Sequence, residues 1–232
     1  MTVAGRPTVL VFDVNETLID LDALRPYFAA TFGDAAVLRE WFDQLVMYSM
    51  TVTLSDCYVD FFALGRAVLQ MLGEIYGISL SDDDTAELAE QMAAMPAHPD
   101  VAQGLSQLRA DGYRVAALTN SPRRPGRPTP LENAGLAGYF ERQLHVEELW
   151  VFKPSTVLYT HTARELGVRP SQCLMVAAHT WDIIGAQRAG FGGALISRPG
   201  NAPLRADGVP QPDFVVDDLG DLARQLAQAF DK

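Results

Sequence analysis

Residues 8–18 read TVLVFDVNETL, in which an apolar run ends at an acidic residue and a polar turn. The apolar run at residues 8–12 is typical of a buried strand, and Asp13 follows at its end, where the chain turns polar. In open α/β sheets, ligands bind beyond the carboxyl ends of the strands, and a carboxylate held there can attack a bound electrophile and form an ester. The stretch therefore predicts a central strand that ends in a nucleophilic Asp13.

Further β-type runs recur along the chain, with helical stretches between them. The predicted strands span residues 8–13, 114–119, 143–146, 173–177, 193–196 and 213–216. Apolar spacing and stop signals predict helices that start near Val101, that run over residues 182–189 before Gly190, and that close the chain at residues 219–230. This alternation predicts an α/β fold with a doubly wound parallel sheet wrapped by helices.

The pattern changes between Leu18 and about Pro96, where helical segments follow one another without a strand candidate. We interpret residues 18–96 as a helical cap subdomain inserted after the first strand, and residues 1–17 and 97–232 as the α/β core domain. The acidic run at residues 81–84 is predicted to begin the last cap helix, because acidic side chains are favourable at the positive end of a helix.

The composition narrows the class of protein. With 232 residues, 48% of them hydrophobic, the chain can bury a full core. A formal net charge of −11, without a run rich in Lys or Arg, argues against nucleic acid or an anionic membrane surface as a partner. No run reaches the roughly 20 apolar residues of a membrane span, and the first residues lack the apolar core of a signal peptide. Cys57 and Cys173 have no metal-ligand spacing, so we expect a reducing compartment and a cytoplasmic protein.

Three more polar motifs follow Asp13 along the chain. Thr119 and Asn120 close an apolar strand with a hydroxyl and an amide, groups suited to holding an oxyanion. Lys153 precedes a helical stretch, and its ammonium can neutralise and orient a carboxylate as a point charge. Asp182 lies near the start of a helix that follows a buried strand, so we expect it at the same edge of the sheet as Asp13.

In their order along the chain, these motifs resemble the four motifs of the haloacid dehalogenase superfamily. Within that superfamily the chain looks most similar to the type II L-2-haloacid dehalogenases. The features that carry this likeness are the early helical cap, Lys153-Pro154 with Tyr159 six places after the Lys, and Trp181-Asp182. The resemblance implies a Rossmann-like core with an inserted cap.

The resemblance also implies a reaction, the hydrolysis of the carbon–halogen bond of a short (S)-2-haloacid. Asp13 would attack C2 and expel the halide, and water would then hydrolyse the aspartyl ester to a 2-hydroxy acid of inverted configuration. The implied partner is a small anionic organic acid, no cofactor is expected, and a homodimer is left open. The implied roles are hydrogen bonds to the nucleophile from Thr17 and Thr119, substrate binding by Asn15, Asn120 and Trp181, charge stabilisation by Lys153 and Tyr159, and orientation or deprotonation of water by Asp182.

The chain departs from the dehalogenase pattern near the nucleophile and in the cap. Dehalogenases of this type usually have an aromatic residue and a Gly where this chain has Asn15 and Glu16. They also carry an Arg that draws out the halide at the position of Phe42, whose apolar ring cannot supply the same charge-assisted donor. Glu16 is expected to be a hydrogen-bonding turn residue that, on an extended backbone, would point away from the site.

His179 and Ala177 replace an Asn and a Ser that position water in these dehalogenases. Two interpretations of His179 stay open. As a neutral imidazole it could accept a proton from the hydrolytic water, or it could simply be a histidine at a helix start that hydrogen-bonds a carboxylate. In the cap, the aromatic residues Phe42, Tyr48 and Phe61 are expected to face the substrate pocket.

Two alternative functions remain. One is a ligand-binding or hydrolytic relative that acts on a non-halogenated compound. The other, a phosphatase, would need Mg²⁺ and a proton-donating acid two places after the nucleophile. Asn15 stands at that position, and an amide cannot donate or accept a proton near pH 7, so phosphate ester hydrolysis is the less favoured alternative.

Overall fold

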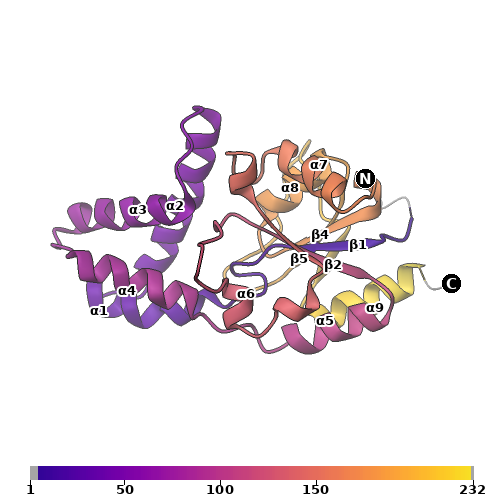
Figure 1. The fold of residues 1–232 in the computed structure, drawn as a ribbon, viewed down its shortest axis with the longest axis horizontal. Coiled ribbons are helices and arrows are strands. Elements are labelled where there is room, and N and C mark those ends of the chain that lie inside the picture. The colour runs from indigo at the N-terminus through magenta and orange to yellow at the C-terminus, as the bar shows by residue number, and fades with distance from the viewer. Residues whose placement is uncertain (1–4, 231–232) are drawn as a thin grey trace.

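The computed structural model describes residues 5–230, and a six-stranded parallel sheet forms its centre (Figure 1). The strands are β1 (Val9–Phe12), β2 (Arg114–Thr119), β3 (Arg142–His145), β4 (Cys173–Ala177), β5 (Gly192–Ile196) and β6 (Phe214–Val216). Their order in the sheet is β3-β2-β1-β4-β5-β6, and each neighbouring pair is parallel. The predicted α/β fold and its six strands are confirmed.

Helices cover both faces of the sheet, and β1 shows why. Its side chains alternate between two apolar cores, as expected for a strand buried on both faces. Val9 and Val11 pack in a core with residues of α7 (Thr156–Glu165) and α8 (Thr180–Arg188). Leu10 and Phe12 pack on the other side, where α5 (Val101–Ala110) and α9 (Leu219–Phe230) lie against each other. Figure 1 shows these two helix pairs on opposite sides of the strands.

The predicted helical cap follows β1 directly. It consists of the 3-10 turn η1 (Leu21–Leu24) and the helices α1 (Arg25–Phe32), α2 (Val37–Leu54), α3 (Phe61–Tyr76) and α4 (Asp82–Ala93). These helices stand beside the sheet as a separate group (Figure 1). Helix α4 begins with the capping box of Ser81 and Asp84, as the acidic run predicted. The domain boundaries at residues 17/18 and 96/97 stay a prediction, and residues 1–4 and 231–232 lie outside the described part.

Shorter elements complete the core. They are α6 (Pro130–Asn133) and the 3-10 turns η2 (Ala137–Tyr139), η3 (Val146–Glu148) and η4 (Pro170–Gln172). The proline-rich loop at residues 122–129 separates β2 from α6. Within residues 5–230, no helix is both long enough and apolar enough to cross a bilayer.

Candidate active site

The candidate site lies where the order of the strands reverses, between β1 and β4. The N–H of Asp13 donates to the carbonyl of Val176 on β4 at 3.0 Å, so the end of β1 is fixed against its neighbour. His179 and Asp182 follow β4 at the start of α8, and Asn120 follows β2 on the other side of β1. Ligand sites of open parallel sheets lie at such a reversal, beyond the carboxyl ends of the strands.

Four buried side chains form a charged group at this edge of the sheet. Lys153 Nζ lies 2.7 Å from Asp13 Oδ1 and 2.5 Å from Asp182 Oδ2, and Tyr159 donates its hydroxyl to Asp182 Oδ1 at 2.6 Å. Lys153, Tyr159 and Asp182 are almost fully buried, and Asp13 is only 4% exposed. Asp13, Lys153 and Asp182, which the sequence analysis placed near separate strand and helix ends, therefore meet at one point, and Tyr159 joins them from α7.

The charges in this group shift the pKa of each member. Burial alone would raise the pKa of Asp13, but the neighbouring Lys153 and His179 hold it well below its usual value. Burial and the nearby Asp13 raise the pKa of Asp182, against the opposing effect of Lys153. Burial would lower the pKa of Lys153, and the two carboxylates raise it instead. Asp13 is thus an anion held next to a cation, the state that a carboxylate nucleophile needs.

Thr17 supports Asp13 from within the same loop. Its hydroxyl donates to Asp13 Oδ2 at 2.7 Å, and its oxygen accepts the N–H of Ala178 at 2.9 Å. Arg198 in turn donates to the Thr17 carbonyl through Nε and Nη2 at 3.1 and 3.0 Å. The loop after β1 is therefore tied both to the turn after β4 and to the segment after β5.

His179 bridges two carboxylates. Its Nδ1 lies 3.4 Å from Asp13 Oδ2, and its Nε2 lies 2.6 Å from Glu16 Oε2. Burial lowers the pKa of the imidazole, but the contacts with Asp13 and Glu16 outweigh that effect and raise the pKa to about 9. His179 is therefore a cation near neutral pH when Asp13 is free. One interpretation of the sequence required a neutral imidazole. These surroundings instead favour the protonated imidazole.

Glu16 and Arg39 belong to the same cluster, and sequence reasoning did not place them in the site. Glu16 is a hydrogen-bonding turn residue, as expected from the sequence. Its backbone is left-handed, with φ of 61°, rather than extended, so its side chain does not point away from the site. This conformation turns its carboxylate toward His179, and Arg39 on α2 donates to both of its oxygens at 2.5 and 3.0 Å. A left-handed non-Gly residue costs roughly 1 kcal/mol, which the two ion pairs offset. The signal was present: Glu16 occupies the Gly position of the resembled motif, where a left-handed turn is expected.

The strand β2 brings a second set of predicted residues to the site. Asn120 Oδ1 accepts the N–H of Lys153 at 3.1 Å, and Asn15 Nδ2 donates to Ser121 Oγ at 3.3 Å. The predicted bond from Thr119 to Asp13 is not formed among residues 5–230, and Thr119 Oγ1 accepts the N–H of Ser121 at 3.1 Å. Thr119 thus stabilises the turn after β2.

The predicted aromatic residues divide into two groups. The rings of Phe42 and Trp181 lie on His179, with centroid distances of 5.7 and 5.0 Å. Phe61 packs on Phe152, the neighbour of Lys153, at 5.9 Å. The hydroxyl of Tyr48 donates to Met71 Sδ on α3 at 3.7 Å, so its polar end is engaged inside the cap rather than with the charged cluster.

A pocket of about 780 Å³ opens beside His179, between the cap and the core. Its lining includes Arg39, Phe42, His179 and Trp181, together with the segment 200–204. Through Arg39 and His179 the charged cluster reaches a hollow large enough for a small organic acid and water, whereas Asp13, Lys153 and Asp182 do not line it. In the described part of the chain, no group of three or more His, Cys, Asp or Glu residues is arranged to hold a metal ion.

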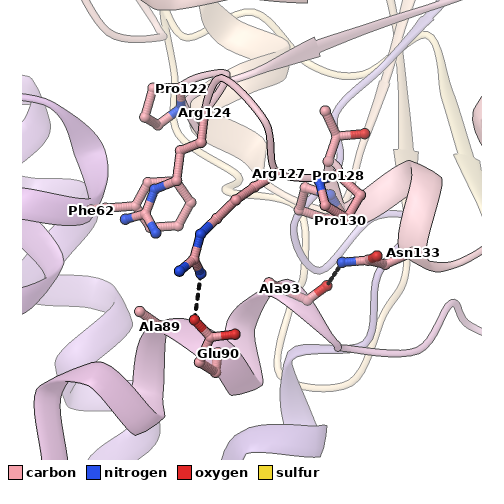
Figure 2. Close-up of a pocket in the computed structure, with 11 residues that line it drawn as sticks. Phe62, Ala89, Glu90, Ala93, Pro122, Arg124, Arg127, Pro128, Pro130 and Asn133 are labelled. Atoms are coloured by element: carbon pink, nitrogen blue, oxygen red, sulfur yellow. Dashed lines mark hydrogen bonds and ion pairs between the residues drawn. The ribbon is translucent and has the colours of Figure 1, made fainter. Parts of the chain in front are cut away.

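A second pocket, of about 370 Å³, lies between the cap and the proline-rich loop (Figure 2). The Arg124 guanidinium lies 3.9 Å from the centre of the Phe62 ring, and Arg127 forms an ion pair with Glu90 on α4. Asn133 Nδ2 also donates to the Ala93 carbonyl at 2.7 Å. The basic loop therefore fastens the core to the cap along this edge.

Comparison with known proteins identifies the family. A family model described as haloacid dehalogenase-like hydrolase matches residues 7–190. The chain belongs to the haloacid dehalogenase-like hydrolases.

Relatives of this hydrolase carry dehalogenase names. (S)-2-haloacid dehalogenase 1 of Pseudomonas sp. (strain CBS-3) is 30% identical over 203 residues, which cover 87% of this chain and 88% of the relative. (S)-2-haloacid dehalogenase 4A of Burkholderia cepacia is 30% identical over 83% of this chain and 84% of its own. The solved structure of the L-2-haloacid dehalogenase from Xanthobacter autotrophicus with covalently bound chloropropionic acid has a TM-score of 0.84 and 26% identity, and the match covers 95% of this chain and 98% of that one.

Proposed function

We propose that this hydrolase cleaves the carbon–halogen bond of short (S)-2-haloacids and releases the 2-hydroxy acid. The observation that carries the proposal is the ionised, buried Asp13 held between Lys153 and Thr17 at the switch point of the sheet. Relatives named (S)-2-haloacid dehalogenases, and a similar structure with covalently bound chloropropionic acid, support the substrate class.

In the proposed first step, a carboxylate oxygen of Asp13 attacks C2 of the substrate from the face opposite the halogen. A bond forms between that oxygen and C2 while the bond from C2 to the halogen breaks, and the halide leaves with the electron pair. Lys153 keeps Asp13 ionised and oriented, and Thr17 fixes the other carboxylate oxygen. The configuration at C2 is inverted because attack and departure are collinear.

In the proposed second step, water adds to the side-chain carbonyl carbon of Asp13 and the ester breaks. This restores Asp13 and releases the hydroxy acid. The carboxylate of the substrate needs donors, and we assign Asn120, Asn15 and backbone amides after β2 to that role. Trp181 and Phe42 would form the apolar wall beside the reacting carbon, since both rings already border the pocket.

Halide release tests this proposal. The purified protein is incubated with fluoroacetate, chloroacetate, bromoacetate and both enantiomers of 2-chloropropionate, with and without EDTA. We expect release from the (S)-enantiomer, no effect of EDTA, and a loss of at least about 1,000-fold in Asp13→Asn, which removes the nucleophile. No halide from any of these acids would contradict the proposal and favour a relative with a non-halogenated substrate.

The phosphatase alternative gains no support from the site. Lys153 lies between Asp13 and Asp182 and contacts both, and the Asn15 amide donates a hydrogen bond to Ser121. Stimulation of p-nitrophenyl phosphate hydrolysis by Mg²⁺ would nevertheless favour it over the dehalogenase.

A further inference from the structure

Asp13, His179 and Glu16 form a continuous buried chain of side chains. Each of the three residues is less than a tenth exposed, and Arg39 closes the chain at its outer end by holding both oxygens of Glu16. An imidazole placed between a reacting group and an orienting carboxylate is the geometry by which hydrolytic triads are recognised, whatever their order in the sequence. In this chain the group that reacts with water is the ester formed on Asp13.

The alternative base, Asp182, is already engaged at both oxygens. Tyr159 donates to one of them, and Lys153 bonds the other. His179 differs, because its Nδ1 is buried near Asp13 and makes no hydrogen bond among residues 5–230, while its Nε2 is fixed by Glu16. Nδ1 is therefore the atom beside Asp13 whose hydrogen-bonding capacity is unused.

We propose that His179 is the general base that activates water against the aspartyl ester, that Glu16 is the residue that positions it, and that Arg39 holds Glu16. This inference rests on the proposed function, in which the ester forms on Asp13. It assigns the second half of the reaction to a His–Glu pair in place of the Asn and Ser that the resembled dehalogenases carry in the last motif.

Ester formation provides the trigger. With Asp13 ionised, His179 is protonated, because its pKa is raised to about 9 by Asp13 and Glu16 against the opposing effect of burial. The ester is neutral, so one of the two anions that stabilise the imidazolium disappears and the pKa of His179 falls. His179 then releases its proton to solvent through the pocket of about 780 Å³ that it lines.

The proton and electron pairs balance over the cycle. Neutral His179 takes a proton from water as the water oxygen bonds to Cγ of Asp13. When the bond between Cγ and the product oxygen breaks, His179 returns that proton to the departing oxygen, which leaves as the hydroxyl of the 2-hydroxy acid. The new carboxylic acid at Asp13 ionises and its proton returns to His179. Each turnover consumes one water and releases one halide ion and one proton.

Several charged groups surround His179, and Asp13 alone changes charge in this scheme. Arg39 and Asp43 on α2 face it from the cap, and their charges stay constant over the cycle. Within residues 5–230, the titratable groups around His179 and its two carboxylates include Asp13 and Glu16 after β1, Arg39 and Asp43 on α2, His98 on the Glu16 carbonyl, Lys153 before α7, and Asp182 on α8.

The coupling between Asp13 and His179 can be measured without turnover. NMR titration follows the imidazole signals of the four histidines in the wild type, in Asp13→Asn and in Glu16→Gln, and His179→Gln identifies the signal of interest. The amide introduced by Asp13→Asn is neutral, as the ester is, so we expect the pKa of His179 to fall by about 1 to 3 from its value near 9. An unchanged titration in Asp13→Asn would overturn the trigger and with it the proposal.

A burst experiment tests the role of the base itself. His179→Gln is expected to release about one halide per active site and then stop, with the ester on Asp13 visible by peptide mass spectrometry and the steady-state rate reduced about 100- to 10,000-fold. His161→Gln, on the surface of α7, is the control and should keep wild-type turnover. Wild-type turnover in His179→Gln, or a slow variant that accumulates no ester, would overturn the proposal. Failure of the wild type to release halide would instead contradict the proposed function, and the titration would still decide whether Asp13 controls His179.

Discussion

Lys153 Nζ lies 2.7 Å from Asp13 Oδ1, although 140 positions separate the two residues in the chain. The same ammonium contacts Asp182, so one buried cation is shared by two buried carboxylates. A lone buried carboxylate would take up a proton, because burial disfavours its charged form. The contact with Lys153 therefore keeps Asp13 both buried and ionised, which a nucleophile shielded from water requires.

Replacing Lys153 with Met should damage both activity and stability. Asp13 and Asp182 would remain buried without the cation that they share, and breaking a buried ion pair costs about 3–5 kcal/mol. We expect halide release to fall below detection and the free energy of unfolding in urea to drop by about that amount. Arg224→Met, which removes an exposed cation paired with Asp221, is the control and should change little. Wild-type stability in Lys153→Met would show that Lys153 does not stabilise the two buried carboxylates.

Replacing Tyr159 with Phe removes the 2.6 Å hydrogen bond to Asp182 while keeping the buried ring. Hydrogen bonds to charged groups contribute about 1.5–3 kcal/mol, so we expect a stability loss of that order and a comparable loss in kcat/KM of roughly 10- to 100-fold. Tyr76→Phe is the matched control, since its hydroxyl makes a bond of the same length to Glu40 on the exposed surface. Equal effects of the two substitutions on urea unfolding would show that burial does not strengthen the hydrogen bond to Asp182.

The protonation of His179 should make folding stability depend on pH. The pKa of its imidazole rises from 6.5 to about 9 on folding, because Asp13 and Glu16 outweigh the effect of burial. The stabilisation is thus fully present below pH 6.5 and is lost as the pH rises through about 9. We expect the wild type to lose up to about 3 kcal/mol of unfolding free energy across this window, and His179→Gln to lose less. Urea unfolding at pH 6, 7.5 and 9.5 measures the difference, and parallel curves for the two proteins would contradict the assigned pKa.

Gly185 on α8 should not tolerate a side chain. A Cβ atom there would lie 2.5 Å from the Pro154 carbonyl oxygen and 2.9 Å from the Tyr159 ring. Gly185→Ala should therefore displace the backbone that carries Lys153 and reduce stability by about 1–3 kcal/mol, with a loss of activity. Gly138→Ala, where no atom lies within 4 Å of the new Cβ, is the control. Thermal unfolding of both variants decides the matter, and equal melting temperatures would show that α8 can shift away from Pro154.

Much of the fold could be predicted from the sequence because the strands are short apolar runs separated by amphipathic helices. The third strand was predicted at residues 143–146 and lies at Arg142–His145. Its position is set by pairing with β2, where Ala116 lies opposite Arg142, and a partner strand is not visible in local sequence. The helical cap was predicted because residues 18–96 contain no strand pattern.

The candidate site was predictable in part. Asp13, Lys153 and Asp182 lie at the ends of strands or the starts of helices, and such positions in parallel sheets converge at one edge. The contacts of Glu16 and Arg39 could not be predicted in this way. They depend on a left-handed backbone at Glu16 and on the approach of α2 from the cap, and both are set by tertiary packing.

The cap also supplies a cation that the sequence analysis did not predict, Arg39. The sequence placed Phe42 where dehalogenases carry an Arg, and the structure adds Arg39 one helical turn earlier on α2. Residues three apart share a face of a helix, so both side chains border the pocket beside His179. In this structure Arg39 forms an ion pair with Glu16, which links the cap to the loop after β1.

Oxygen labelling under single-turnover conditions shows whether an ester forms on Asp13. Excess protein is mixed with (S)-2-chloropropionate in H₂¹⁸O, and Asp13 and the product lactate are analysed by mass spectrometry. Covalent catalysis predicts one ¹⁸O in the side chain of Asp13 and none in the new hydroxyl of the lactate. Label in the lactate hydroxyl, with none in Asp13, would show direct attack by water and contradict the aspartyl ester.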